Sequence, residues 1–304
     1  MKTKLCRNTL YGLVLASTSL IANATQFVDP FVFTSDRNTK TLDLLMVAKP
    51  GPINALPGVN GWVYNICERK YSIGDQCQKD KTNPNPYGGS RLQINQGDTL
   101  KIHLINELPL APEAIHQFDP GEQFLIQNPT NIHTHGMLVT PTSLLPNTPN
   151  TKYGDNIFVL TFNINNGQPI ITPNTHVHGD VNMDSTDYQI TVPAHHPSGL
   201  FWFHPHAHGI SMNQISAGLS GALTVGQLTD YVTGLPASTK VNNLILKDIQ
   251  VNGDNTINDQ EDPGFCTSLA TQPGFCNGAN NGKWYFTLSG QLNPSINVNA
   301  TGQV

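Results

Sequence analysis

Two short runs of this 304-residue chain carry histidine at every second position. They are NIHTHG, residues 131–136, and GLFWFHPHAHG, residues 199–209. Both runs have the apolar and aromatic flanks of buried β-strands, and alternate side chains of a strand point to one face. His133 and His135 are therefore predicted to share a face, and so are His204 and His206. Buried imidazoles need polar partners, and two such pairs brought together form a ligand set for copper or zinc.

The rest of the chain favours a fold built from strands. Charged residues make up only 12% of the sequence, which contains 26 glycines and 22 prolines. Short runs of strand-forming residues alternate with turn-forming segments, the pattern of an all-β sandwich. No basic patch with interleaved aromatic residues occurs, so we expect no nucleic-acid partner. The predicted strands are residues 41–48, 99–106, 156–164, 187–192, 200–206, 221–225 and 241–251.

Residues 1–24 have the features of a cleaved signal peptide. Lys2, Lys4 and Arg7 precede a short apolar run, and Ala22-Asn23-Ala24 is a small-x-small cleavage site. The apolar run is too short and too interrupted for a stable membrane anchor. Cleavage removes three positive charges and no acidic residue, so the net charge changes from −5 to −8. We expect an exported protein, periplasmic or secreted, with no affinity for membranes after cleavage.

Four cysteines remain after this segment. An even number in an exported chain suggests disulfides, and four cysteines allow three pairings. Both close pairs are ten residues apart, so we expect Cys67–Cys77 and Cys266–Cys276. A cysteine metal site is the alternative, but no C-x-x-C spacing supports it.

The two histidine runs together resemble the first-domain signature of the bacterial multicopper oxidases, the family of laccases and copper-resistance oxidases. That signature is H-x-H-G followed some seventy residues later by F-W-[FY]-H-P-H-x-H-G, and here 71 residues separate His133 from His204. Residues 91–109 and 186–226 resemble the same family, so the resemblance covers most of the chain after the signal segment. It implies a cupredoxin-like Greek-key β-sandwich or barrel.

The resemblance also implies individual roles. His133 matches a ligand of the single, type 2 copper, whereas His135, His204 and His206 match ligands of the paired, type 3 coppers. His208 is expected to share their face by alternation and to support the ligands rather than bind metal. Asp155, which follows the first pair by about twenty residues, is a candidate supporting residue or proton relay, with a plain surface-turn aspartate as the alternative.

Compared with this family, the sequence contains only part of the copper machinery. We expect a cupredoxin-like domain over residues 25–229, a linker over 230–240 and an incomplete second domain over 241–304. The family's C-terminal signatures, H-P-x-H-L-H-G-H and H-C-H, do not occur. The chain is therefore expected to hold half of the cluster ligands and no type 1 (blue) copper site.

Several functions remain open on these grounds. The first is the N-terminal portion of a multicopper oxidase that couples one-electron oxidation of a phenol or metal ion to reduction of dioxygen, with the missing ligands supplied by a C-terminal chain or lost. By itself the 304-residue chain is not expected to be competent. The alternatives are a non-catalytic periplasmic copper-binding module and an inert remnant of an oxidase gene. A zinc hydrolase is weaker still, because no H-E-x-x-H motif occurs.

The other histidines are not expected to bind the same metal. A third pair, His176 and His178, forms either an auxiliary metal site or a solvated loop. A group of acidic and amide residues faintly resembles a calcium loop but lacks its spacing, so we expect a turn. The residues of that group are Asp254, Asn255, Asp259 and Asp262.

Overall fold

The computed structural model describes residues 25–111, 121–141, 152–171, 179–236, 239–259 and 283–297. The predicted signal peptide, the Cys266–Cys276 pair and the third histidine pair lie outside these ranges. Among the residues that are described, no helix is long and apolar enough to cross a membrane.

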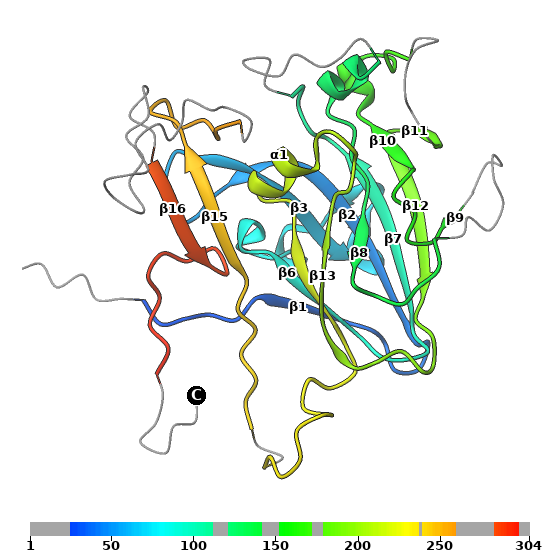
Figure 1. Ribbon diagram of the computed structural model, residues 1–304, viewed down its shortest axis with the longest axis vertical. Helices are drawn as coiled ribbons and strands as arrows, with labels where there is room; N and C mark the ends of the chain where they lie inside the picture. Colours follow the sequence, from blue (N-terminus) through cyan, green and yellow to red (C-terminus); the bar gives the residue numbers. More distant parts are fainter. Residues whose placement is uncertain are drawn as a thin grey trace, which may run out of the picture.

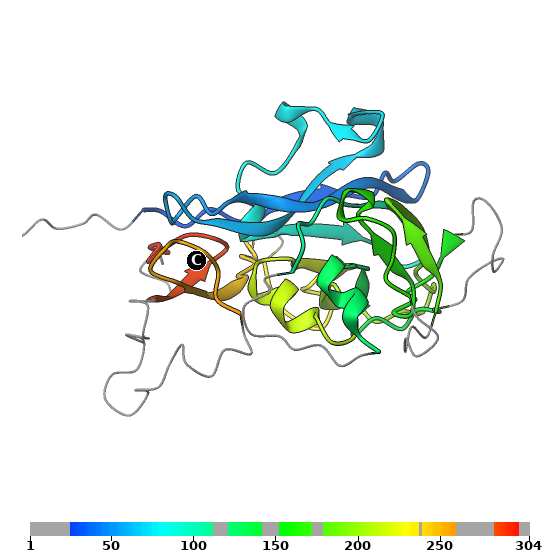
Figure 2. The same ribbon diagram turned by 90° about the horizontal axis from the view of Figure 1, so that it is seen from above.

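Two five-stranded sheets pack face to face, and Figure 2 shows them as two layers. The first sheet has the order β1 (Phe31–Thr34), β6 (Ser90–Ile94), β14 (Gly221–Val225), β13 (Gly199–His204) and β8 (His133–His135). The second has the order β3 (Asn60–Glu68), β2 (Thr41–Pro52), β7 (Thr99–Asn106), β12 (Ser185–Thr191) and β9 (Lys152–Tyr153). The chain passes repeatedly from one sheet to the other, as in a Greek-key sandwich (Figure 1). The prediction of an all-β sandwich is confirmed.

Alternation along the strands explains why these sheets pack. In β7, Leu100, Ile102 and Leu104 are buried in the main core, whereas Lys101 and His103 on the opposite face are partly exposed. The first sheet contributes Leu92, Leu223 and Phe203 to the same core, among other apolar residues. At roughly 25 cal/mol per Å² of apolar surface removed from water, this shared core is the main stabilising contribution.

The remaining elements are short. Two small sheets are formed by β4 (Ser72–Ile73) with β5 (Gln76–Cys77), and by β10 (Leu160–Phe162) with β11 (Val181–Met183). The helical turns are α1 (Ser211–Ser216), η1 (Arg69–Tyr71), η2 (Lys79–Lys81), η3 (Pro86–Gly88), η4 (Gln123–Gln127) and η5 (Ile164–Asn166).

Two of the predicted strands are too long. Only Leu160–Phe162 of residues 156–164 is a strand, because Asn163 accepts a hydrogen bond from the backbone of Asn165 and starts the turn η5. The strand predicted over residues 200–206 ends at His204, since Pro205 has no N–H group with which to continue the ladder.

The predicted Cys67–Cys77 disulfide is confirmed, with an Sγ–Sγ distance of 2.05 Å. It ties the end of β3 to β5 and covers a small apolar cluster on the outer face of the second sheet, which includes Leu45, Val47 and Ile105. The pairing predicted for Cys266 and Cys276 falls on residues that are not described.

A two-stranded sheet follows the sandwich in the chain. It consists of β15 (Leu246–Val251) and β16 (Lys283–Leu288), which pair antiparallel beside the sandwich (Figure 1). The strand begins at Leu246 rather than at the predicted residue 241. Ile249 and Val251 of β15 pack against Val63 and Tyr87 in a second apolar cluster, so the hairpin is joined to the sandwich through buried contacts.

Candidate metal centre

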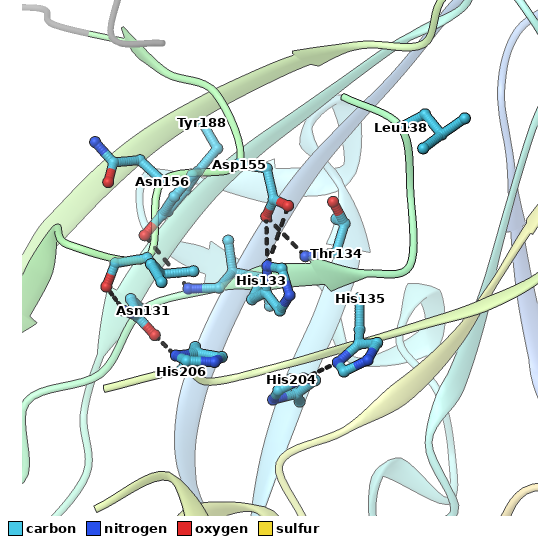
Figure 3. Close-up of polar contacts among 12 residues, drawn as sticks. Asn131, His133, Thr134, His135, Leu138, Asp155, Asn156, Tyr188, His204 and His206 are labelled. Carbon is cyan, nitrogen blue, oxygen red and sulfur yellow. Dashed lines mark hydrogen bonds and ion pairs between the residues drawn. The ribbon is translucent and has the colours of Figure 1, made fainter. Parts of the chain in front are cut away.

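The pairing of β8 with β13 brings the two histidine runs together. These strands are antiparallel, with His133 opposite His204 and His135 opposite Trp202. Residues opposite each other in a sheet share a face. The intervening residues Thr134 and Phe203 are buried on the other face, toward the core. The sheet register therefore presents three imidazoles on one surface of the sandwich (Figure 3).

Three of the four predicted ligands lie within metal-binding range of one another. Each of His133, His135 and His204 offers one ring nitrogen, and these nitrogens all lie within 4.8 Å of one another. His135 Nδ1 lies 3.1 Å from His204 Nε2. Among the described residues, no other histidine, cysteine or acidic side chains form such a group.

His206 lies next to this group but is not part of it. Its ring centroid is 5.2 Å from that of His133 and 5.9 Å from that of His204. The period-two argument does not apply here, because the strand stops before Pro205. The backbone N–H of His206 instead donates to Asn131 Oδ1 at 2.6 Å. His208 lies in the exposed turn beyond, so alternation does not place it on the histidine face.

Asp155 holds His133 in a defined orientation. Its two carboxylate oxygens each lie 3.1 Å from His133 Nδ1, and Oδ1 also accepts from the backbone N–H of Thr134 at 2.8 Å. The side chain is only 8% exposed, so the surface-turn interpretation of this residue is wrong. With Nδ1–H donated to the carboxylate, the lone pair of His133 is on Nε2, which is the arrangement found around metal-ligating histidines.

His204 is kept neutral by its surroundings. It is 5% exposed, and its Nδ1–H donates to the Pro205 carbonyl at 2.8 Å, which leaves an acceptor lone pair on Nε2. Burial, with smaller contributions from the neighbouring histidines, lowers the pKa of His204 from its usual 6.5 to about 4. A neutral imidazole is the form that binds metal.

Trp202 covers the same histidines from one side. Its ring stacks on His204 with a centroid distance of 4.0 Å and lies 5.0 Å from the ring of His135. The indole is 37% exposed, so it separates His204 from solvent while remaining at the surface itself. The indole therefore covers one side of the histidine pair.

The other described histidines have different partners. His196 is buried, accepts from Leu138 N at 2.9 Å and faces the Pro197 carbonyl at 2.8 Å, so both ring nitrogens bind backbone groups. His103 lies on the second sheet beside Asp187 and Asp75.

In the acidic group, Asp254 accepts from the backbone and side chain of Thr256, as expected for a turn, and Asp262 lies outside the described ranges.

Sequence spacing missed the residues that support the histidines from behind. Asn131 contacts His206, and the Tyr188 hydroxyl accepts from Ile132 N at 3.3 Å, immediately before the first histidine. Asn131 stands two positions before His133 in the motif itself, but nothing in the spacing indicates where its side chain points.

Comparisons with known proteins give a likeness in structure only. No protein-family model and no curated protein matches the chain. Among solved structures, it is similar to a laccase from Pediococcus acidilactici, with 16% identity, a TM-score of 0.48 and coverage of 90% of this chain and 43% of that one. The multicopper oxidase of Campylobacter jejuni, a metallo-oxidase, gives 15% identity, a TM-score of 0.48 and coverage of 90% and 44%. The multicopper oxidase of Aquifex aeolicus gives 15% identity, a TM-score of 0.48 and coverage of 90% of this chain and 43% of that one. The chain thus spans less than half the length of these structures.

Proposed function

We propose that His133, His135, His204 and His206 bind copper, and that this chain is the N-terminal portion of an exported multicopper oxidase. The observation that carries the proposal is the strand register, which sets His133 directly opposite His204 with His135 on the same face. The family resemblance of the two histidine runs adds the identity of the metal.

The side chains of the four histidines suit copper. All the proposed ligands are imidazoles, which copper binds well, and the nearest carboxylate is engaged with a ring nitrogen rather than directed at the centre. Imidazoles also suit zinc, so the choice of copper rests on H-x-H-G and F-W-F-H-P-H-x-H-G rather than on the donors alone. Copper held by these histidines would supply one-electron redox chemistry toward dioxygen.

The side chains of this chain would have separate tasks around such a cluster. Asp155 holds the proton of His133 Nδ1 and so directs Nε2 outward. Burial keeps His204 deprotonated at Nε2. Trp202 and Phe203 exclude water from either side of the strand. His208 is proposed to support the site from the turn that follows.

The proposed reaction oxidises a phenol or metal ion by one electron at a time and needs groups beyond those described. On this proposal, residues 25–229 form the copper-binding domain and residues 241–304 begin a second one. The type 1 copper site and four further histidines would come from another segment or a partner chain.

A copper-binding module without catalysis is the second candidate. A type 1 copper requires a cysteine thiolate, whereas Cys67 and Cys77 are joined in a disulfide remote from the histidines. The described residues therefore offer histidines for a metal but no cysteine thiolate for a type 1 copper.

Copper titration of the chain lacking residues 1–24 tests the proposal. We expect tight Cu(II) binding by calorimetry, with nitrogen coordination in the paramagnetic resonance spectrum and no band near 600 nm. His204→Ala should weaken binding at least ~10-fold, whereas His195→Ala, which changes an exposed histidine, should not. Equal affinities of the wild type and His204→Ala would refute the assignment. Phenol-dependent dioxygen uptake, with a C-terminal partner added, distinguishes an oxidase from a binding module.

A further inference from the structure

His206 is the one proposed ligand whose position is not set by strand pairing. β13 ends at His204, and Pro205 supplies no N–H group. From Ala207 onward the chain is held again, because the Ala207 carbonyl accepts from the N–H groups of Ile210 and Ser211 at the start of α1. His206 lies between these two supports, and its N–H group donates to the side chain of Asn131.

Both polar atoms of the Asn131 side-chain amide form hydrogen bonds. Oδ1 accepts from His206 N at 2.6 Å, and Nδ2 donates to the Ile157 carbonyl at 2.9 Å. Ile157 follows Asp155 by two residues, and Asp155 is the residue that orients His133. One fully buried side chain thus connects the segment before the first histidine pair, the segment that carries Asp155, and the second histidine pair (Figure 3).

The backbone that carries this amide is itself fixed. Thr130 exchanges two backbone hydrogen bonds with Thr161, at 2.9 and 2.7 Å, and Ile132 N donates to the Tyr188 hydroxyl. Hydrogen bonds therefore fix the backbone on both sides of Asn131. The position of its side chain is set by these bonds and does not depend on His206. A residue with only a donor or only an acceptor would leave one of these two backbone groups without its partner, and an apolar residue of the same size would leave both without one.

We propose that Asn131 is a positioning residue that fixes His206 at the metal centre and couples its position to that of the Asp155 segment. The inference rests on the proposed function for its consequence, metal binding, but its structural part concerns the chain alone. It accounts for how a histidine beyond the end of its strand stays within 5.2 Å of the His133 ring, measured between centroids.

Nuclear magnetic resonance of the metal-free, ¹⁵N-labelled protein tests the positioning directly. In Asn131→Ala, we expect the His206 amide proton to move upfield and the His206 ring signals to broaden, while those of His204 stay in place. Asn83→Ala is the matched control, because Asn83 is also buried, donates to the Gly89 carbonyl and accepts from Asn85 N away from the histidines. Unchanged His206 signals in folded Asn131→Ala would overturn the proposal.

A second variant covers the case in which Asn131→Ala does not fold. Asn131→Asp has the same shape and keeps an oxygen acceptor for His206 N, so the His206 amide proton must remain downfield. Loss of that downfield position in Asn131→Asp would equally contradict the assignment.

Copper binding gives an independent readout through a double-mutant cycle. Asn131→Ala should lower the Cu(II) affinity ~10- to 100-fold, as loss of a supporting hydrogen bond does at other metal sites. In a His206→Ala background the same change should have a much smaller effect, because the ligand that it positions is gone and only its bond to the Asp155 segment is lost. Equal losses in both backgrounds would refute the coupling. If the wild type binds no copper, the proposed function fails, while the metal-free spectra still decide the role of Asn131.

Discussion

Lys247 offers a quantitative test of how the β15–β16 hairpin is attached to the sandwich. Its side chain is buried, with the residue 8% exposed, and Nζ donates to the carbonyls of Gly218 and Ser220 at 2.7 and 3.1 Å. The ammonium also lies 5.2 Å from the centre of the Tyr87 ring. Burial lowers the pKa of Lys247 from its usual 10.5 to about 7.

The sign of the pH dependence follows from proton counting. Between pH 7 and 10.5 the unfolded chain carries a proton on Lys247 that the folded chain has lost, so stability rises with pH across this window. The full difference in pKa corresponds to about 5 kcal/mol, at roughly 1.4 kcal/mol per pH unit. This value is an upper bound, because the two carbonyls and the Tyr87 ring favour the charged form.

The assay compares urea unfolding of the wild type and Lys247→Met at pH 7, 8, 9 and 10. Methionine leaves two carbonyls without their donor, at a cost of about 1–3 kcal/mol each that does not vary with pH. The test is therefore how the difference in unfolding free energy between the wild type and Lys247→Met changes with pH. We expect this difference to shift in favour of the wild type as pH rises. Lys240→Met, which changes an exposed lysine, should show no such gain. Parallel curves for the wild type and Lys247→Met would show that the buried amine titrates normally and would refute the reasoning.

Three further predictions concern the sandwich and its histidines. In the metal-free protein, nitrogen resonance should show a neutral His204 ring at pH 5. The free energy of unfolding should fall as pH falls from 6.5 to about 4, because only the unfolded chain takes up the proton in that range. A ring that titrates near 6.5 contradicts this. Replacing Cys67 and Cys77 by serine should lower the free energy of unfolding by about 3 kcal/mol, the loop entropy for a ten-residue span, as measured by urea unfolding. Gly221→Ala should destabilise by about 1–3 kcal/mol, because a Cβ there meets the Phe203 ring and the Ser90 carbonyl at 2.7 Å; Gly199→Ala, with contacts no closer than 3.4 Å, is the control.

Alternation predicted the part of the candidate metal centre that the strands position, and it missed the part beyond the end of β13. His133, His135 and His204 share a face because β8 and β13 continue through them. His206 follows a proline, and its position depends on a side chain 75 residues earlier in the chain, a contact that no local pattern encodes. Asp155 was identified as a candidate by proximity in sequence, but its burial and its bond to His133 required the fold.

The overall architecture was easier to predict than the points at which its strands end. Short runs of β-branched and aromatic residues between turns indicated an all-β sandwich, and ten-residue spacing indicated the Cys67–Cys77 bond. Strand lengths were harder, since asparagines around residue 163 start a turn within an apolar run. That choice depends on competition between side-chain and backbone hydrogen bonds, which composition does not resolve.

The pairing of His133 with His204 across two strands makes any metal bound there a reporter of sheet assembly. A slip of one residue between β8 and β13 would turn Thr134 or Phe203 outward and send an imidazole into the apolar interior. Misregistered sheets would therefore lack the three convergent nitrogens, so an ion that needs all three would distinguish the correctly paired sheet from a slipped one.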